Sequence, residues 1–155
     1  MDQRVERVEA EDEAQRIADR VREAMFANDR ASRALGMRIT HIAPGKATMT
    51  MTVRADMLNG FGTCHGGLIA TLADSAFAFA CNSSNRMAVA AGLSIDFVAP
   101  AQEGDLLTAE AVEVSQAGRS GVYDVTVSNQ RGERVALFRG RSHRVNGRSA
   151  VAEIG

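Results

Sequence analysis

The spacing of apolar residues changes period along the chain, and each change predicts a different element. Residues 9–35 are rich in Ala, Glu and Arg, which favour helix, and their apolar positions recur at helical spacing as far as a stop at Gly36. Between 47 and 53 alanine, methionine and valine alternate with threonine, a pattern typical of a half-buried strand. A Pro-Gly turn before it predicts a preceding strand at 37–42. The first third of the chain therefore predicts one amphipathic helix and a pair of strands.

The segment 67–82 has a different character from the rest of the chain. Its sequence, GLIATLADSAFAFACN, is apolar on nearly every face, which predicts a buried helix. Four strand-like stretches follow it, at 87–98, 106–114, 121–129 and 134–145, and the last ten residues show no clear pattern. This order predicts an α+β fold in which an antiparallel meander wraps around one long central helix. We expect a single domain over 1–155, with an extra N-terminal helix at 9–35, a core at 36–145 and a short C-terminal tail.

Length, charge and cysteine content narrow the class of protein. A chain of 155 residues can bury a core without disulfides, and a net charge of −1 gives no basic surface for nucleic acid or an anionic membrane. No apolar run is long enough to cross a bilayer, and the charged N-terminus lacks a leader pattern. Cys64 and Cys81 are too few for a disulfide framework, and the three histidines lack metal-ligand spacing. We expect a cytoplasmic protein with no metal, no membrane partner and no nucleic-acid partner.

Asp74 stands out within the apolar helix, because its neighbours in the sequence are almost all apolar. Burying an unpaired carboxylate is unfavourable, so this group must be paired, protonated or exposed to a cavity. A structural aspartate bonded to a neighbouring loop or subunit fits this position. A catalytic carboxylate with a tuned pKa fits it equally.

The start of the same helix, His65-Gly66-Gly67, is the second feature of interest. A helix N-terminus presents free N–H donors that can hold a developing oxyanion, although a tight turn alone also explains paired glycines. Asp74 lies seven or eight residues further on, roughly 11 Å along a helix, which is too far for both groups to act on one carbonyl. If they cooperate, they come from two chains, which predicts a dimer with its site at the subunit interface.

Three residues near the helix start allow more than one interpretation. Asn59, which precedes a glycine, either forms a turn or orients a water molecule near the carboxylate. Cys64 has no His/Asn arrangement around it, so we interpret it as small buried filler rather than a nucleophile. We interpret His65 as a residue that fixes the loop rather than a base.

Four runs of the sequence carry a resemblance to a known family: LNGFGTCHGGLIATLADSAFAFACNS from Leu58, SIDFVAP from Ser94, GVYDVTVSNQ from Gly121 and ALFRGRSHR from Ala136. In these runs the chain resembles the hot-dog thioesterases of phenylacetic acid degradation, the PaaI/PaaD type. The similarity spans roughly 35–145 and implies the hot-dog fold. HGG followed by an acidic residue in the next helix occurs in many hot-dog thioesterases. The ending NQ…ALFRGRSHR occurs in a narrower set of them, and it is what points to the phenylacetate group.

The resemblance also implies roles for single residues. Asp74 falls on the catalytic carboxylate, as nucleophile or as general base toward water, and Gly66 on the residue whose N–H polarises the thioester carbonyl. Asn59 falls on the position that helps place water, with His65 supporting the loop. The implied activity is hydrolysis of phenylacetyl-CoA and its ring-hydroxylated relatives to CoA and the free acid, with no cofactor beyond the CoA of the substrate. The implied assembly is a homotetramer, a dimer of dimers with active sites between subunits.

Thioester chemistry agrees with these residue types. A thioester is already activated, so one carboxylate, one oxyanion donor and a positioned water suffice without a metal. An aryl group also needs an apolar pocket. Phosphates of CoA would favour arginines such as Arg86, Arg139 or Arg141, although a solvated surface charge explains each of them as well. The candidate substrate-binding residues are Met57, Leu58, Phe61, Gly67 and Phe77.

Other functions remain open for the same fold. A hot-dog hydratase or dehydratase needs an Asp/His pair placed for proton abstraction and return, and the helix start carries no such pair. A non-catalytic acyl-CoA-binding protein would not need an aspartate in the apolar helix, and neither would a purely structural oligomer. Asp74 therefore favours an acyl-CoA thioesterase.

Overall fold

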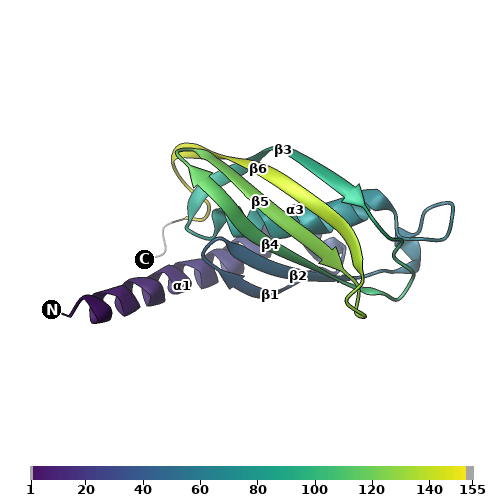
Figure 1. Cartoon of the computed structure of the whole chain (residues 1–155), viewed down its shortest axis with the longest axis horizontal. Helices are drawn as coiled ribbons and strands as arrows, with labels where there is room; N and C mark the ends of the chain where they lie inside the picture. Colours follow the sequence, from purple (N-terminus) through teal and green to yellow (C-terminus); the bar gives the residue numbers. More distant parts are fainter. Residues whose placement is uncertain (1, 153–155) are drawn as a thin grey trace.

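The computed structural model describes residues 2–152, in which one sheet curves around one helix (Figure 1). Helix α3 contacts all six strands, which confirms the predicted α+β hot-dog arrangement of a sheet around a central helix. No helix in this range is both long and apolar enough to span a membrane. In chain order the elements are α1 Gln3–Asn28, α2 Arg30–Ala34, β1 Arg38–Ala43, β2 Lys46–Thr52, the short 3₁₀ helix η1 Ala55–Met57, α3 Gly66–Asn82, β3 Arg86–Phe97, β4 Leu106–Ala117, β5 Ser120–Ser128 and β6 Arg134–Ser149.

The sheet is antiparallel, with the strand order β1-β2-β4-β5-β6-β3. Strands β4, β5 and β6 form a meander, as expected. The prediction that the stretch at 87–98 belongs to this meander is wrong, because β3 pairs with β6 at the far edge of the sheet and not with β4. Strand β3 follows α3, which crosses the sheet, so the chain re-enters the sheet at the edge opposite to β1.

The N-terminal helical region differs from the single helix predicted at 9–35. Helix α1 begins earlier, at Gln3, and projects from the body of the molecule (Figure 1). The helix is interrupted at Asp29, whose side chain accepts a hydrogen bond from the Ser32 N–H and caps the short helix α2. A capping aspartate competes with the continuing helix for backbone donors, which explains the break.

The C-terminal segment is also more ordered than its sequence pattern predicted. Strand β6 continues to Ser149 instead of ending at 145, and Ser149 pairs with Arg86 at the start of β3. Asn85 then accepts hydrogen bonds from the N–H groups of Ala150 and Val151. The remainder of the predicted tail, 153–155, lies outside the described residues.

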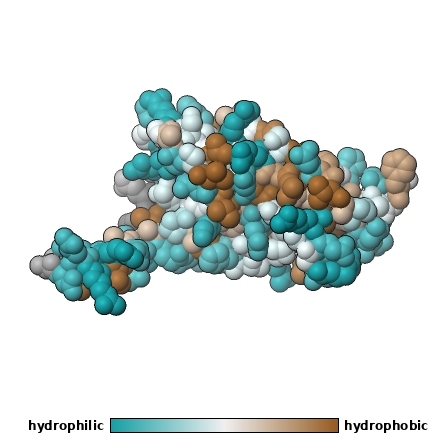
Figure 2. Space-filling model, viewed as in Figure 1, coloured by the Kyte–Doolittle hydropathy of each residue, from teal (hydrophilic) through white to brown (hydrophobic). Residues whose placement is uncertain are grey.

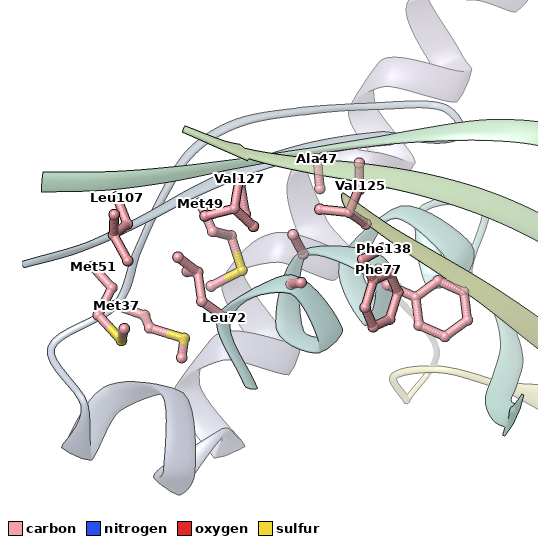
Figure 3. Packing of buried hydrophobic residues seen from close by; sticks show 14 of the residues in the cluster. Met37, Ala47, Met49, Met51, Leu72, Phe77, Leu107, Val125, Val127 and Phe138 are labelled. Atoms are coloured by element: carbon pink, nitrogen blue, oxygen red, sulfur yellow. The ribbon is translucent and has the colours of Figure 1, made fainter. Parts of the chain in front are cut away.

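The core lies between α3 and the inner face of the sheet (Figure 3). Phe77 of α3 packs against Tyr123 and Phe138, with ring centroids 5.5 and 5.8 Å away. Gly140 of β6 makes this possible, because a Cβ there would lie 2.9 Å from the Phe77 ring. Leu72 fills the other end of the helix among methionines and valines of the sheet. Apolar packing therefore fixes α3 across the sheet and determines which side of the helix remains uncovered.

The outer face of the sheet carries apolar as well as polar side chains. Figure 2 shows apolar residues gathered over the strands. Val112 and Leu137 are exposed, and their neighbours in the strand register place them on the face opposite to α3. Exposed apolar surface of this kind is typical of a face that contacts another chain.

Candidate active site

Helix α3 begins at a loop that hydrogen bonds hold in place. The His65 N–H donates to the Met57 carbonyl at 2.8 Å, and the His65 carbonyl accepts from the Leu68 N–H at 3.0 Å. The His65 Nδ1 accepts from the Gly67 N–H at 3.2 Å, so His65 is the N-cap of the helix. Because Nδ1 is an acceptor here, the neutral ring carries its proton on Nε2. His65 therefore fixes the helix start in this chain.

Gly66 offers the donor that this arrangement leaves free. Its backbone N–H donates no hydrogen bond to any residue in the range 2–152. A Cβ at this position would lie 3.0 Å from the Phe97 ring, so a larger residue would have to push this half-exposed ring aside. An unpaired N–H at the positive end of a helix dipole can bind a carbonyl oxygen and stabilise it as it becomes an oxyanion.

A cavity of about 410 Å³ opens in front of Gly66. The side-chain oxygen of Asn59 accepts from the N–H groups of Phe61 and Thr63, while its Nδ2 donates to the Thr63 hydroxyl at 3.1 Å. Asn59 therefore closes its own loop and presents this loop to the cavity. The cavity is lined by Asn59, Thr63, Cys64, Gly66, Ile69, Phe97 and the segment 98–101.

Asp74 does not line this cavity. Eight residues of one helix separate it from Gly66, which corresponds to about 12 Å. The carboxylate is half-buried, and it forms no hydrogen bond or ion pair with residues 2–152. Burial raises the pKa of Asp74 above its ordinary value, and the nearby Asp29 carboxylate raises it further. The structure thus places an unpaired carboxylate with a perturbed pKa on the helix, away from the oxyanion donor of its own chain.

The side of α3 that carries Asp74 faces an uncovered surface. Gly67, Thr71, Asp74 and Ala78 follow one another at helical spacing and are all partly exposed. Beside them, Leu93 and Phe97 of β3 are 47% and 51% exposed. Both pair with β6 residues that face α3, so they point to the same side of the sheet as the helix. The uncovered side of α3 and the inner face of β3 therefore form one continuous surface, which we call the α3–β3 face.

The predicted substrate-binding residues occupy three different environments. Phe61 lies at the tip of the 59–63 loop and is 95% exposed, and Gly67 is exposed at the helix start. Leu58 is partly buried and packs against the core. Met57 and Phe77 are core residues with 1% exposure each, and the structure does not bring them to the cavity at Gly66.

Cys64 is a buried, unpaired cysteine at the wall of this cavity. Burial raises the pKa of its thiol, which keeps the group protonated at neutral pH. A protonated thiol is a poor nucleophile, in agreement with the interpretation of Cys64 as filler.

Sequence reasoning missed a hydrogen-bonded network behind Asp74. Asp29 accepts from the Ser32 hydroxyl at 2.7 Å, and this hydroxyl lies 2.8 Å from that of Ser75. Both serines are buried, and the network joins the N-terminal helices to α3 at the residue after Asp74. The Asp-x-x-Ser spacing of a helix cap was the available signal, but it stood inside what looked like one continuous helix.

A second missed residue, Asp105, holds the wall of the cavity. Its carboxylate accepts from the Gln102 N–H at 2.8 Å and from the Gln130 amide at 2.9 Å. These bonds lower the pKa of Asp105 and fix the turn that follows Ala101, whose carbonyl accepts from the Cys64 N–H at 2.8 Å. Asp105 is therefore a structural carboxylate, in contrast to Asp74.

Two further features bear on possible ligands. A hollow of about 490 Å³ between α1 and β1 contains none of the predicted site residues. Within residues 2–152, no three His, Cys, Asp or Glu side chains are grouped so that they could hold a metal ion.

Comparison with known proteins agrees with this geometry. Residues 61–136 match the thioesterase superfamily. Acyl-coenzyme A thioesterase PaaI of Escherichia coli (strain K12) is 51% identical over 124 residues, which are 80% of this chain and 89% of that protein. The solved structure of the E. coli PaaI protein from the phenylacetic acid degradation operon has a TM-score of 0.85 at 47% identity, covering 87% of this chain and 98% of that chain.

More distant structures share the same fold. The TT0310 protein of Thermus thermophilus has a TM-score of 0.73 at 43% identity, covering 76% of this chain and 99% of that chain. A thioesterase protein of Streptococcus pneumoniae TIGR4, solved with coenzyme A, has a TM-score of 0.70 at 27% identity, covering 73% of this chain and 91% of that chain. With its fold, its glycine–helix junction and the aspartate within α3, the chain belongs to the thioesterase superfamily and is a hot-dog protein of the PaaI type.

Proposed function

We propose that this protein is an acyl-CoA thioesterase that hydrolyses phenylacetyl-CoA and its ring-hydroxylated derivatives to CoA and the free acid. The observation that carries the proposal is the pair of complementary groups on α3. One is the free Gly66 N–H at the helix start, and the other is the unpaired, half-buried carboxylate of Asp74. The identity to E. coli PaaI supports the arylacetyl substrate class.

The reaction needs only groups of the chain and a water molecule. The Gly66 N–H holds the thioester oxygen and stabilises the negative charge that develops there. Asp74 attacks the carbonyl carbon itself, or it takes a proton from the water that attacks. The C–S bond then breaks, and the departing CoA thiolate takes up a proton from Asp74 or from water. Where Asp74 is the nucleophile, this step leaves an Asp74–acyl anhydride, which a water molecule hydrolyses to the free acid and the restored Asp74 carboxylate. Asn59, in the same cavity as Gly66, supports the placement of the water, and His65 keeps the Gly66 N–H in position.

Each active site uses Gly66 of one chain and Asp74 of another. Within one chain about 12 Å separates the two residues, which is beyond the reach of a single carbonyl group. Strand β3 pairs only with β6 among residues 2–152, so it presents an open edge next to the exposed apolar side chains Leu93 and Phe97. A second copy on the α3–β3 face would cover this surface and bring its own α3 toward the first. Apolar residues on the outer sheet face support a dimer of dimers.

A hydratase or dehydratase is less well supported by the geometry. Such an enzyme needs an aspartate and a histidine that act on one substrate. The Nδ1 of His65 is occupied by the helix cap.

We also place the enzyme in the cytoplasm, because its two cysteines are free and buried rather than paired.

Steady-state hydrolysis of an acyl-CoA panel tests the proposal. The panel runs from acetyl-CoA through phenylacetyl-CoA to 3,4-dihydroxyphenylacetyl-CoA, with release of free thiol as the signal. The wild type is expected to prefer the arylacetyl thioesters, and Asp74→Asn is expected to lose about 10²–10⁴-fold in kcat. Asp12→Asn on the exposed surface of α1 is the matched control and should retain full activity. No hydrolysis by the wild type, or full activity in Asp74→Asn, would reject the assignment.

A further inference from the structure

A second cavity, of about 400 Å³, lies at the end of the sheet where β4 turns into β5, at the upper left of Figure 1. We call it the arginine cavity. The turn between β4 and β5, the start of β3 and the end of β6 meet there. None of the residues that line it belongs to the cavity at Gly66. It is lined by Asn85, Arg86, Gly118, Arg119, Arg144 and the segment 145–149, which includes Arg148.

The arginine cavity contains four positive charges and no acidic side chain. Among residues 2–152, none of its guanidinium groups forms an ion pair. By contrast, Arg131 in the turn between β5 and β6 and Arg139 on β6 each bind a carboxylate, at 2.8 and 2.7 Å. Four unpaired arginines around one hollow repel one another, so this arrangement is stabilised when an anion enters.

Arg144 provides the most specific sign of a missing partner. Its Nε is buried, and no acceptor within residues 2–152 pairs with it. The backbone N–H of Arg144 donates to the backbone carbonyl of Arg119 at 2.8 Å, which holds the two residues side by side. A buried N–H donor without an acceptor is unfavourable, so the groups of the chain itself leave Arg144 incompletely paired.

Hydrogen bonds also hold the rim of the cavity in shape. Asn85 adopts a left-handed conformation with φ of 61°, and its carbonyl and side-chain oxygens accept from Ala150 and Val151 at 3.2 and 2.9 Å. These bonds tie the end of β6 across the start of β3. The arginines are therefore presented by a closed loop and not by free chain ends.

We propose that the arginine cavity is a binding site for phosphate groups. Guanidinium groups match the oxygens of phosphate with pairs of N–H donors, and a cluster of them favours a multiply charged phosphate over a single carboxylate. The phosphate comes either from the nucleotide end of a CoA thioester or from a separate phosphate ligand. The CoA source rests on the proposed function. If two copies pair their β3 edges, the strands run antiparallel, which carries Arg86 of the second copy toward the Phe97 end of the first.

Calorimetric titration of the full-length protein with pyrophosphate tests the site. The variant Arg119→Ala/Arg148→Ala removes two exposed arginines of the cavity and leaves the partly buried Arg144 in place. We expect it to bind pyrophosphate at least about tenfold more weakly than the wild type, at equal thermal stability. The control Arg7→Ala/Arg16→Ala removes the same charge from exposed positions on α1 and should bind as the wild type does. Absence of binding to the wild type, or equal binding by the cavity variant, would overturn the proposal.

Kinetics with two thioesters distinguish the sources of the phosphate. Phenylacetyl-CoA carries the nucleotide, and phenylacetyl-pantetheine lacks it. If the substrate occupies the cavity, the variant raises KM for phenylacetyl-CoA and leaves kcat and the pantetheine thioester unaffected. If pyrophosphate binding is lost while both KM values stay unchanged, the cavity serves a separate phosphate ligand. If the wild type hydrolyses neither thioester, the proposed function fails, and the titration still decides whether the phosphate site exists.

Discussion

At the scale of single residues, the environments of two aspartates assign them different roles. Asp105 is buried and fully hydrogen bonded, which lowers its pKa, whereas Asp74 is half-buried without a partner, which raises its pKa. A carboxylate with a raised pKa binds protons more readily and is better suited to proton transfer near neutral pH. The network from Asp29 through Ser32 to Ser75 places a second negative charge behind Asp74.

Asp29→Asn should move the pH dependence of the enzyme toward acid. The asparagine oxygen can still accept from Ser32, but the charge that raises the pKa of Asp74 is gone. The pKa of Asp74 falls, so its active carboxylate form persists at lower pH. In a profile of kcat/KM against pH, the acidic limb should shift to lower pH. An acidic limb that stays in place or moves to higher pH would show that Asp29 does not tune Asp74.

Asp74→Asn should make the protein more stable at neutral pH. A raised pKa means that the folded state binds protons more tightly than the unfolded state, so folding is favoured below the unfolded pKa of about 3.9. That advantage is lost as the pH rises through the folded pKa, and asparagine carries no such loss. Thermal unfolding should show a higher Tm for the variant at pH 7 and a smaller difference near pH 3. A lower Tm at pH 7 would mean that the charge of Asp74 stabilises the fold.

At the scale of elements, the start of α3 is where local structure and chemistry meet. His65→Ala removes the acceptor of the Gly67 N–H and should lower the free energy of unfolding by about 0.5–2 kcal/mol. The Gly66 N–H would then be held less firmly, so kcat should fall as well. His65→Asn, which can cap a helix, should recover most of the stability, as measured by urea unfolding. Equal stability of the alanine variant would show that this cap contributes little.

Most helices and strands were predictable from the sequence, but the contacts between elements far apart in the chain were not. Alternation between 47 and 53 and the apolar run of α3 were visible because they are local patterns. The pairing of β3 with β6 joins residues more than 35 positions apart. The local pattern of apolar residues does not predict which distant strands pair. Asp74 was recognisable as a carboxylate among apolar residues, whereas the Ser32–Ser75 contact is long-range. Met57 and Phe77 show the remaining difficulty, because an apolar residue in the core looks like one that lines a pocket.

At the scale of the whole molecule, the open edge of β3 and the separation of Gly66 from Asp74 point to an assembly. The α3–β3 face carries Asp74 together with the exposed Leu93 and Phe97. Covering this face would bury apolar surface and the carboxylate at the same time. The central claim is therefore that each active site is built from two chains, and it can be tested by complementation between two inactive variants.

The measurement is the activity of mixed oligomers of Asp74→Asn and Gly66→Pro, formed by co-expression and compared with each variant alone. Proline removes the N–H of residue 66, and the first position of a helix tolerates proline. A hybrid dimer contains one site with both substitutions and one with neither. Random mixing should therefore restore about a quarter of the wild-type activity if the dimer is two-fold symmetric. Such recovery is the predicted result. If the mixture is no more active than either variant by itself, each chain carries its own complete site and the shared-site account is wrong.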